Sequence, residues 1–343
     1  MTNAGIAELL ALEAEEATGS LRMAFKRAAR RAFLWPDEAS DLAARGLTLT
    51  TLTGVGPFIE RKILSWLNDP PKKHNGSELR SNFLTLAEAR RILARRPGWT
   101  ASYKGDLQMH TDWSDGSGTV RDMAEAAIAR GYEYIAITDH SKGLKIAGGI
   151  NEAELQEQRA EIVTVNKQFA NSGKQFRVLS SVELNLNTQG QGDMEPSALR
   201  KLDLVVGSFH SALRQTTDQT DRYIAALSNP SVNILGHPRG RIYNFRRGLA
   251  ADWKRVFATA VKLDKAVEVD SYPDRQDLDV SLLKIAKKEG VRIAIDTDAH
   301  APEQLAFVEL GLAAALQAGI AGEKIINFMP TDALIAWAQA TRA

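Results

Sequence analysis

The feature that most constrains the fold is a regular alternation of short β-rich runs with helical stretches, which begins at Gly105. Seven apolar or β-branched runs take part, and helical stretches separate or follow them. They occupy residues 106–110, 134–138, 176–184, 204–207, 232–236, 266–269 and 292–297. Strands that alternate with helices form a parallel sheet. The pattern therefore predicts an α/β fold, and at this number of strands we expect the sheet to close into a β/α barrel.

The first third of the chain has a different pattern. Residues 1–70 carry apolar positions at helical spacing and predict a small all-α domain. Residues 71–104 predict a polar, turn-rich linker followed by a helix, and residues 105–343 form the barrel domain. Residues 1–104 contain 16 Lys and Arg against 11 Asp and Glu. These basic residues form either a solvated face or a surface for phosphates.

Composition limits the chemistry that is available. The chain has no cysteine, so disulfides and thiolate metal sites are excluded and histidine and carboxylates remain as ligands. The N-terminus carries acidic residues where a secretory signal would carry basic ones, and no apolar run reaches the length of a membrane span. We therefore expect a cytoplasmic protein without a membrane-spanning segment.

Five of the six histidines stand at or just after the end of a predicted strand. They are His110, His140, His210, His237 and His300. Glu183 interrupts the end of a further apolar run in the same way. In a β/α barrel these ends open onto one face, where active sites are built. One such histidine would most often be structural, but five together, with carboxylates beside them, predict a site for divalent metal.

The same residues lie in motifs that resemble those of the PHP (polymerase and histidinol phosphatase) family. The resemblance covers about residues 104–330. The motifs are Gly105–Thr111 with Ser114–Gly116, Thr138–His140, Glu183–Asn185, Gly207–Ser211, Gly236–Pro238 and Asp298–His300. The resemblance implies a distorted (β/α)7 TIM-like barrel with a trinuclear site for Zn²⁺, Mn²⁺ or Fe²⁺. It also implies a phosphoesterase in which hydroxide activated by the metals attacks phosphorus.

The resemblance also implies a role for each ligand. The three proposed metal sites are His110, Glu183 and Asp298; Glu183, His210 and His237; and Asp115, His140 and His300. Glu183 would bridge two ions, and Asp298 is preferred over Asp296 because Asp-x-His is the family spacing. One position departs from the pattern, because Gln108 replaces the first histidine of a His-x-His motif. An amide oxygen is a weaker ligand than imidazole, so Gln108 is a possible ligand to a site that favours a harder ion.

PHP domains attached to bacterial family X DNA polymerases are the most similar subfamily, because they share residues 236–241 and 273–278. We expect Glu183, Asp298 and Arg241 to act in catalysis. Candidate side chains for holding the substrate phosphate are Arg239, Arg241, Arg275, Lys142 and Lys145. Alternatively, each of these side chains is an ordinary surface charge. Asp106 and Asp139 adjoin ligands, and we expect them to orient those ligands.

Residues 52–63 resemble a helix-hairpin-helix motif. The Gly-x-Gly turn at Gly54 and Gly56 could offer backbone N–H groups to a DNA phosphate, with Lys62 nearby. A tight turn between two packed helices also requires glycine, so a purely structural role is the alternative. About 100 residues cannot hold a family X polymerase palm, and they contain no Asp-x-Asp metal motif, so polymerase activity is not expected.

Three functions therefore remain open. The first is a phosphoesterase that acts on nucleic-acid ends, either as a 3′-5′ exonuclease or as an end-processing phosphatase. The second is a small-molecule phosphatase of the histidinol-phosphate or nucleotide type, with the helical region as a lid or interface. The third is a non-catalytic DNA-binding module with a degenerate metal site. The expected partner is accordingly DNA or a phosphorylated small molecule, and the oligomeric state is left open.

Overall fold

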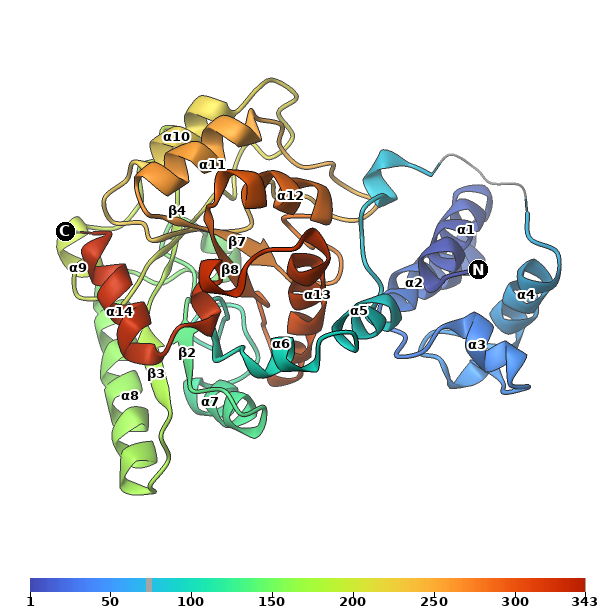
Figure 1. Ribbon diagram of the computed structural model, residues 1–343, viewed down its shortest axis with the longest axis horizontal. Helices are drawn as coiled ribbons and strands as arrows, with labels where there is room; N and C mark the ends of the chain where they lie inside the picture. The colour runs from blue at the N-terminus through green and yellow to red at the C-terminus, as the bar shows by residue number, and fades with distance from the viewer. Residues whose placement is uncertain (72–75, 343) are drawn as a thin grey trace.

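The computed structural model describes residues 1–71 and 76–342, and in it a helical N-terminal region lies beside a larger α/β domain (Figure 1). The N-terminal helices surround a core of their own, formed mainly by side chains between Ile6 and Ile63. Their bounds are α1 Asn3–Glu16, α2 Gly19–Ala32, α3 Ala39–Ala44, η1 Leu49–Thr51 and α4 Pro57–Asn68. Three further short helices, η2 Glu78–Arg80, α5 Leu86–Leu93 and α6 Pro97–Ala101, lead to the first strand.

The strands of the α/β domain are short, buried and all parallel. They form a three-stranded sheet, β1-β2-β3, and a five-stranded sheet, β4-β5-β6-β7-β8. Their bounds are β1 Gly105–Asp106, β2 Tyr134–Ile137, β3 Arg177–Ser180, β4 Glu183–Asn185, β5 Val206–Ser208, β6 Ile234–Leu235, β7 Ala266–Asp270 and β8 Arg292–Asp296. Both faces of parallel strands are covered, which explains why these runs are almost continuously apolar.

The two sheets approach each other at two places. Isolated parallel bridges join Met109 to Ala299 and His140 to Glu183, just beyond the ends of the regular strands. The run predicted as one strand at 176–184 is divided at Ser181 and Val182 into β3, which pairs with β2, and β4, which pairs with β5. If β3 and β4 are counted as one run, the structure has the seven strand segments that the sequence predicts. The change of partner directs Glu183 toward the bridge with His140.

Helices and short 3₁₀ turns follow the strands and cover the sheets (Figure 1). They are α7 Val120–Ala129, η3 Lys145–Ala147, α8 Glu152–Asn171, α9 Pro196–Leu199, α10 Thr220–Leu227, α11 Trp253–Lys262, α12 Val280–Glu289, η4 Pro302–Phe307, α13 Val308–Ala318, η5 Gly322–Lys324, η6 Ile326–Phe328 and α14 Thr331–Ala340. Capping boxes fix where two of them begin: Thr119 with Asp122 at α7, and Asn151 with Glu154 at α8.

Specific side chains attach the N-terminal helices to the α/β domain. Tyr243 of the α/β domain packs edge-on against Phe33, with ring centroids 4.7 Å apart, and joins the N-terminal core. The Arg80 guanidinium forms ion pairs with Glu8 at 2.8 Å and Glu15 at 2.7 Å, and donates to Asn244 at 2.9 Å. The two regions are therefore held together by an aromatic contact and a largely buried cation.

The parallel α/β architecture predicted from the sequence is confirmed, and residues 1–71 and 76–104 are helical or irregular, as expected. Barrel closure and the domain limits at 70 and 104 stay predictions. Part of the predicted linker, at 72–75, lies outside the described residues. Across the described ranges, no helix is both long enough and apolar enough to cross a membrane.

Candidate metal centre

The expected ligands lie in loops just after the strands, and backbone hydrogen bonds tie these loops together. The N–H of His110 donates to the carbonyl of Ala299 at 2.8 Å. The N–H of Met109 donates to Oγ1 of Thr138 at 2.9 Å. The loop after β1 is thus held against the loops after β2 and β8, which brings together His110 and Asp298, 188 residues apart in the chain.

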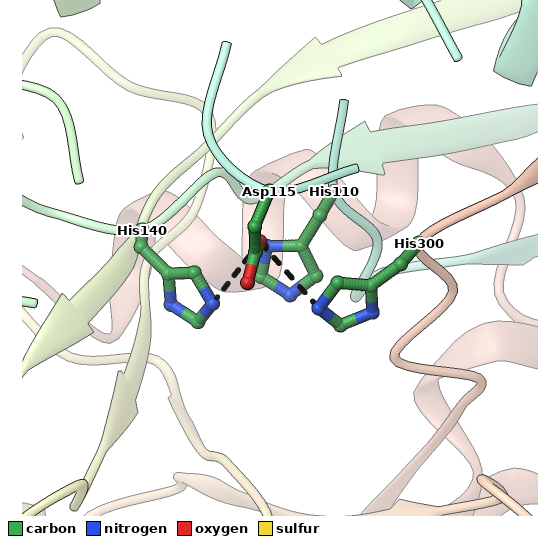
Figure 2. Close-up of side chains that lie close together, drawn as sticks. All are labelled: His110, Asp115, His140 and His300. Carbon is green, nitrogen blue, oxygen red and sulfur yellow. Dashed lines mark ion pairs between the residues drawn. The ribbon is translucent and has the colours of Figure 1, made fainter. Parts of the chain in front are cut away.

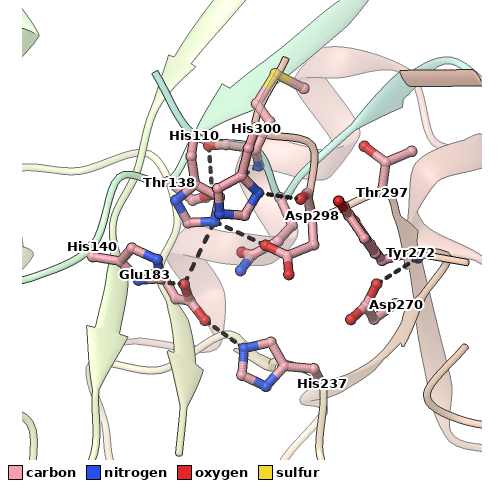
Figure 3. Close-up of polar contacts among 12 residues, drawn as sticks. His110, Thr138, His140, Glu183, His237, Asp270, Tyr272, Thr297, Asp298 and His300 are labelled. Carbon is pink, nitrogen blue, oxygen red and sulfur yellow. Dashed lines mark hydrogen bonds and ion pairs between the residues drawn. The ribbon is translucent and has the colours of Figure 1, made fainter. Parts of the chain in front are cut away.

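Glu183 lies at the centre of the cluster, fully buried among histidines (Figure 3). Its Oε1 is 2.7 Å from Nε2 of His237 and 3.3 Å from Nε2 of His210. Its Oε2 is 2.8 Å from Nδ1 of His140 and 3.6 Å from Nε2 of His110. One carboxylate therefore faces four imidazoles from four different loops, which is the arrangement of a bridging ligand.

Asp115 is the centre of a second group, at the open side of the site (Figure 2). Its Oδ1 is 3.5 Å from Nε2 of both His140 and His300, and 4.0 Å from Nδ1 of His110. The ring of His110 lies between the other two, with ring centroids 4.3 Å from each. Ligands about 2 Å from a common ion are separated by distances of this order.

The third group joins His110 and Glu183 to Asp298. Oδ1 of Asp298 is 2.9 Å from Nε2 of His110, and its Oδ2 accepts a hydrogen bond from the guanidinium of Arg275. The backbone of Asp298 has φ 51°, a conformation that non-glycine residues adopt only when the surroundings impose it. In contrast, Oδ1 of Asp296 accepts from the N–H of Leu107 at 2.8 Å, so the geometry favours Asp298 as the ligand.

The residues fit divalent cations. In three groups of side chains, the possible ligand atoms all lie within 4.8 Å of one another. The first group is His110, Asp115, His140 and His300. The second is His140, Glu183 and His210, and the third is His110, Glu183 and Asp298. Within the cluster, Nδ1 of His110 is buried and has no hydrogen-bond partner among the described residues. An unsatisfied buried polar atom costs about 1–3 kcal/mol, and a coordinated cation removes that cost. The second group differs from the expectation, because His140 takes the place of His237.

The charges of the cluster stabilise one another. Burial raises the pKa of Glu183, but the facing His140 and His210 overcome it and hold this pKa well below its ordinary value. Burial lowers the pKa of His237, yet its bond to Glu183 raises it to about 9. For Asp298, burial raises the pKa while Arg275 and His110 lower it below its ordinary range. Both carboxylates are therefore ionised and available as ligands at neutral pH.

Gln108 and three acidic residues of the α/β domain are fully buried. Neither amide atom of Gln108 has a hydrogen-bond partner in the described part of the chain, although the residue is fully buried. Glu268, Asp270 and Asp296 are also fully buried, and burial together with repulsion from neighbouring carboxylates raises the pKa of each well above its ordinary value. Sequence reasoning overlooked Glu268 and Asp270, although both interrupt the apolar run Ala266–Asp270.

Asp139 and Asp106 orient the ligand loops, as their positions beside ligands predict. Asp139 accepts hydrogen bonds from the N–H of Thr111 at 2.8 Å and from Nε2 of Gln158 at 2.6 Å. Asp106 accepts from Oγ1 of Thr297 at 2.7 Å. Asn185 lies 3.2 Å from Nδ1 of His210, so it fixes that ring and leaves Nε2 toward Glu183.

The phosphate-binding roles expected for Arg239 and Arg241 stay predictions, although both guanidinium groups already bind protein groups. All three guanidinium nitrogens of Arg241 donate elsewhere: to the carbonyl of Arg275 at 2.8 Å, to Asp279 at 3.1 Å and to the carbonyl of Asn82 at 2.7 Å. Arg239 donates to the same Asp279 at 2.9 Å. Both cations neutralise a buried carboxylate at the start of α12 and hold loops together, so a phosphate would have to compete with these contacts.

The other expected phosphate ligands differ in position. Arg275 lines a pocket of about 310 Å³ that also contains His140, His210 and His237. Lys142 is paired with Glu152 at 2.7 Å, and Lys145 is exposed in η3. Arg246 lines the same pocket and was missed, because it lies outside every motif. Arg241, Arg246 and Arg275 all line this pocket, and of the three only Arg241 has every guanidinium nitrogen bonded to protein groups among the described residues.

The predicted hairpin forms a tight turn before α4. Gly54 has φ +85°, and Gly56 is the residue before the first turn of α4, which begins at Pro57. A Cβ at Gly54 would lie 3.4 Å from Cβ of Arg31, so α2 packs directly against this turn. Lys62 forms an ion pair with Glu13 at 2.7 Å, so its expected contact with DNA would have to compete with this pair.

The sequence matches the family model described as the PHP domain over residues 106–297, which is more than half of the chain. The chain belongs to the PHP domain family. It is a metal-dependent phosphoester hydrolase of that family. The match begins at Asp106 and ends at Thr297, just before Asp298 and His300, so it spans six of the eight expected ligands.

The chain is similar to two curated proteins and to one solved structure. The DNA polymerase/3′-5′ exonuclease PolX of Bacillus subtilis (strain 168) is 38% identical over 225 residues, which are 65% of this chain and 39% of PolX. A probable phosphatase of Thermoanaerobacter sp. (strain X514) is 28% identical over 61% of this chain and 83% of its own length. Histidinol phosphate phosphatase of Lactococcus lactis, solved with zinc, L-histidinol and phosphate, aligns at 16% identity with a TM-score of 0.48, covering 64% of this chain and 95% of its own. The chain thus spans about two fifths of the length of PolX.

Proposed function

We propose that this chain hydrolyses phosphoester bonds at nucleic-acid ends, as a 3′-5′ exonuclease or an end-processing phosphatase. The observation that carries the hydrolytic part is the convergence of four imidazoles on the buried carboxylate of Glu183. The nucleic-acid part is supported by the Gly54 turn, which lies against the basic helix α2. The 38% identity to PolX, whose name includes 3′-5′ exonuclease, supports the same choice.

The ligand set suits three divalent ions, and His/carboxylate donors without thiolates are compatible with Zn²⁺, Mn²⁺ or Fe²⁺. His110, Glu183 and Asp298 would hold one ion, Glu183 with His210 and His237 a second, and Asp115, His140 and His300 the third. Divalent ions at these positions would activate water and neutralise charge on the phosphoryl oxygens. His140 could serve either of the last two ions, because Nδ1 faces Glu183 and Nε2 faces Asp115.

In this proposal Arg275 and Arg246 bind the substrate phosphate. Arg275 keeps one nitrogen on Asp298 and lines the pocket, so its charge lies next to the position where a phosphoryl oxygen would sit. Asp298 thereby serves as ligand and as anchor for Arg275. Glu183 and Asp298 keep the catalytic importance predicted for them, whereas Arg241 supports the loop that carries Arg275.

A small-molecule phosphomonoesterase is the second candidate. Two observations favour it: the pocket beside the ligands has a volume of only about 310 Å³, and the probable phosphatase of Thermoanaerobacter matches over 83% of its length. In this alternative the helical region would be an interface or a lid. A non-catalytic DNA-binding module would require a defective metal site, and Gln108 is the only ligand position that departs from the family pattern.

One experiment separates the three candidates. The purified chain, loaded with Mn²⁺, is offered end-labelled single-stranded and double-stranded DNA and, separately, a panel of phosphomonoesters. Release of nucleotides or terminal phosphate from DNA, absent in His210→Ala, supports the proposal. Robust turnover of monoesters without any change in the DNA would refute it in favour of the second candidate. DNA binding without hydrolysis of either substrate would favour the third.

A further inference from the structure

A second groove lies between the basic helix α2 and the α/β domain, separate from the pocket that the metal ligands line. It has a volume of about 580 Å³. One wall is α2, which contributes Lys26, Arg27, Arg30 and Arg31. The opposite wall is formed by Tyr243, by residues 272–274 and by Gln304 and Phe307 of η4. The groove thus joins two regions that the sequence alone leaves independent.

The cations on the α2 wall have no ion-pair partner among residues 1–71 and 76–342. All four are exposed, whereas Phe25, on the opposite face of the helix, is buried in the N-terminal core. Lys26 and Arg30, and likewise Arg27 and Arg31, are four positions apart on the helix, so like charges adjoin. Each such pair destabilises an isolated helix by about 0.2–0.5 kcal/mol. A polyanion in the groove would turn this repulsion into attraction.

The opposite wall presents aromatic rings. Tyr272 and Phe307 are half-buried and pack edge-to-face, with ring centroids 5.2 Å apart. Asp274 is the only acidic residue that lines the groove among the described residues. Cations on one wall and partly exposed rings on the other are the two elements that bind a nucleic-acid strand without regard to sequence: phosphates contact the cations and unpaired bases stack on the rings.

Both ends of the groove lead to features already described. At one end, the stem of Arg31 lies against the Gly54 turn of the hairpin. At the other, the guanidinium of Arg275 lies 5.3 Å from the Tyr272 ring and bonds to Asp298, beside which Figure 3 shows Tyr272. Oε1 of Gln304 also accepts a hydrogen bond at 2.7 Å from the N–H of His300. The groove therefore runs from the hairpin to the edge of the metal centre.

We propose that this groove binds a single nucleic-acid strand, with its phosphates on α2 and its bases against Tyr272 and Phe307, and directs the end of that strand to the metal centre. The inference rests on the proposed function and adds to it the path and the form of the substrate. A single strand is required because the edges and faces of bases in a duplex are already paired and stacked. Hydrolysis at the end of this path would release one terminal unit at a time.

The test uses the full chain loaded with Mn²⁺ and a fluorescent ten-residue oligothymidylate whose phosphorothioate linkages resist hydrolysis. Arg27→Glu combined with Arg30→Glu should weaken binding about tenfold or more at low salt. The slope of log K against log salt should become shallower by about 1.4, since each single-strand phosphate contact contributes about 0.7. Hydrolysis of p-nitrophenyl phosphate, which is too small to occupy the groove and the metal centre together, should not change.

The matched control reverses two exposed lysines on α11, Lys254→Glu with Lys262→Glu, which changes the net charge equally at a helix remote from α2 in Figure 1. Binding by this variant should stay within about twofold of the wild type. A third variant, Phe307→Leu, removes one ring and should weaken binding about fivefold, because stacking on an aromatic side chain contributes about 1–3 kcal/mol per base. It should also reduce the quenching of a 2-aminopurine placed near the strand end.

Four outcomes would overturn the inference, and they can be told apart. If both double variants lose affinity equally, net charge and not the groove attracts the strand. If neither loses affinity while the wild type degrades DNA, the strand takes another path and the proposed function stands. If the wild type neither binds nor degrades DNA but hydrolyses monoesters, the proposed function fails as well. Tighter binding of a blunt duplex than of the single strand, equally sensitive to Arg27 and Arg30, would also contradict it.

Discussion

Oε1 of Glu183 lies 2.7 Å from Nε2 of His237, although 54 residues separate the two in the chain. The contact depends on the division of one predicted strand into β3 and β4, because β4 pairs with β5 and carries Glu183 into the middle of the cluster. From there the same carboxylate also faces His110, His140 and His210. The centre is therefore organised around one acidic residue.

Replacement of that residue should dismantle the centre. Glu183→Gln removes the charge that bridges two proposed ions, so we expect two of three metal ions to be lost and kcat/KM to fall by more than the ~100-fold typical of residues that only orient a ligand. Metal content measured by mass spectrometry of the purified protein, together with phosphoester turnover, checks this. Glu161→Gln, which removes one charge from a carboxylate bound to the Trp113 indole, is the control. Unchanged metal content in Glu183→Gln would rule out the bridging role.

The second prediction concerns Gln108 and the metal preference of the same centre. The side chain is fully buried and both amide atoms lack a partner among the described residues, which is consistent with the possible ligand role predicted for it. Gln108→His should supply an imidazole and raise affinity for Zn²⁺ more than for Mn²⁺. Competition between the protein and a chelator, carried out with each metal, measures the two affinities. If Gln108→His and Gln108→Ala bind both metals as the wild type does, Gln108 is not a ligand position.

The sequence predicted the strands and the residues that the structure brings into one cluster, because their signals are local. A histidine at the end of an apolar run indicates both a strand and its active-site end. Helix α8, predicted at about 152–170, extends over Glu152–Asn171, since Asn151 and Glu154 form a capping box that sequence alone reveals. The resemblance to the family placed His110 and Asp298 at one proposed metal site, and the 2.9 Å distance between them agrees with that grouping.

The partner of each arginine was not predictable, because it depends on long-range packing. Arg241 follows a ligand motif, and nothing in its neighbourhood shows that Asp279, 38 residues later, takes its charge. The same holds for Lys62, whose partner Glu13 belongs to another helix. The groove beside α2 depends on the docking of two regions, which no local pattern specifies. A basic residue near a motif therefore contacts the substrate only when no acidic residue from another part of the chain pairs with it.

Arg80 should contribute strongly to the docking of the helical region. Its side chain is 5% exposed and binds Glu8, Glu15 and Asn244. Arg80→Ala should lower the free energy of unfolding by about 2 kcal/mol, less than for a fully buried pair because both acids keep contact with water. Urea denaturation measures it. Arg247→Ala removes an ion pair to Glu78 in which both side chains are about 70% exposed, and should change stability by less than about 0.5 kcal/mol.

Lys265 should make stability depend on pH at alkaline values. Burial and the charge of Arg342 lower its pKa from 10.5 to about 8, while its ammonium donates to the carbonyls of Val232 and Thr341. Between pH 8 and 10.5 the unfolded chain therefore binds more protons than the folded one, so this residue's contribution to stability rises with pH. Below pH 8 the free-energy cost of keeping Lys265 charged in the folded protein is fully present. Above pH 10.5 this cost is absent, because Lys265 is neutral in both the folded and the unfolded chain.

The comparison that isolates this effect is between the wild type and Lys265→Met. The difference between their unfolding free energies should move in favour of the wild type from pH 8 to 10.5, by up to ~1.4 kcal/mol per pH unit. Urea denaturation at pH 7, 8.5 and 10 measures it, and Lys262→Met, at an exposed lysine of the preceding helix, controls for the loss of a lysine. A difference that stays constant with pH would contradict the lowered pKa.

The hairpin turn offers the last prediction, which separates a DNA contact from a structural turn. Gly54→Ala with Gly56→Ala adds two methyl groups, one of them at φ +85° and 3.4 Å from Arg31, so the turn must shift and its N–H groups lose their direction. If these groups bind phosphate, DNA affinity should fall roughly tenfold while hydrolysis of a small phosphomonoester stays unchanged. Gly46→Ala is the matched control, because it has φ +70° with open space around it and imposes similar backbone strain outside the turn. Equal loss of DNA affinity in both variants would show that strain in the helical region, and not the turn itself, is responsible.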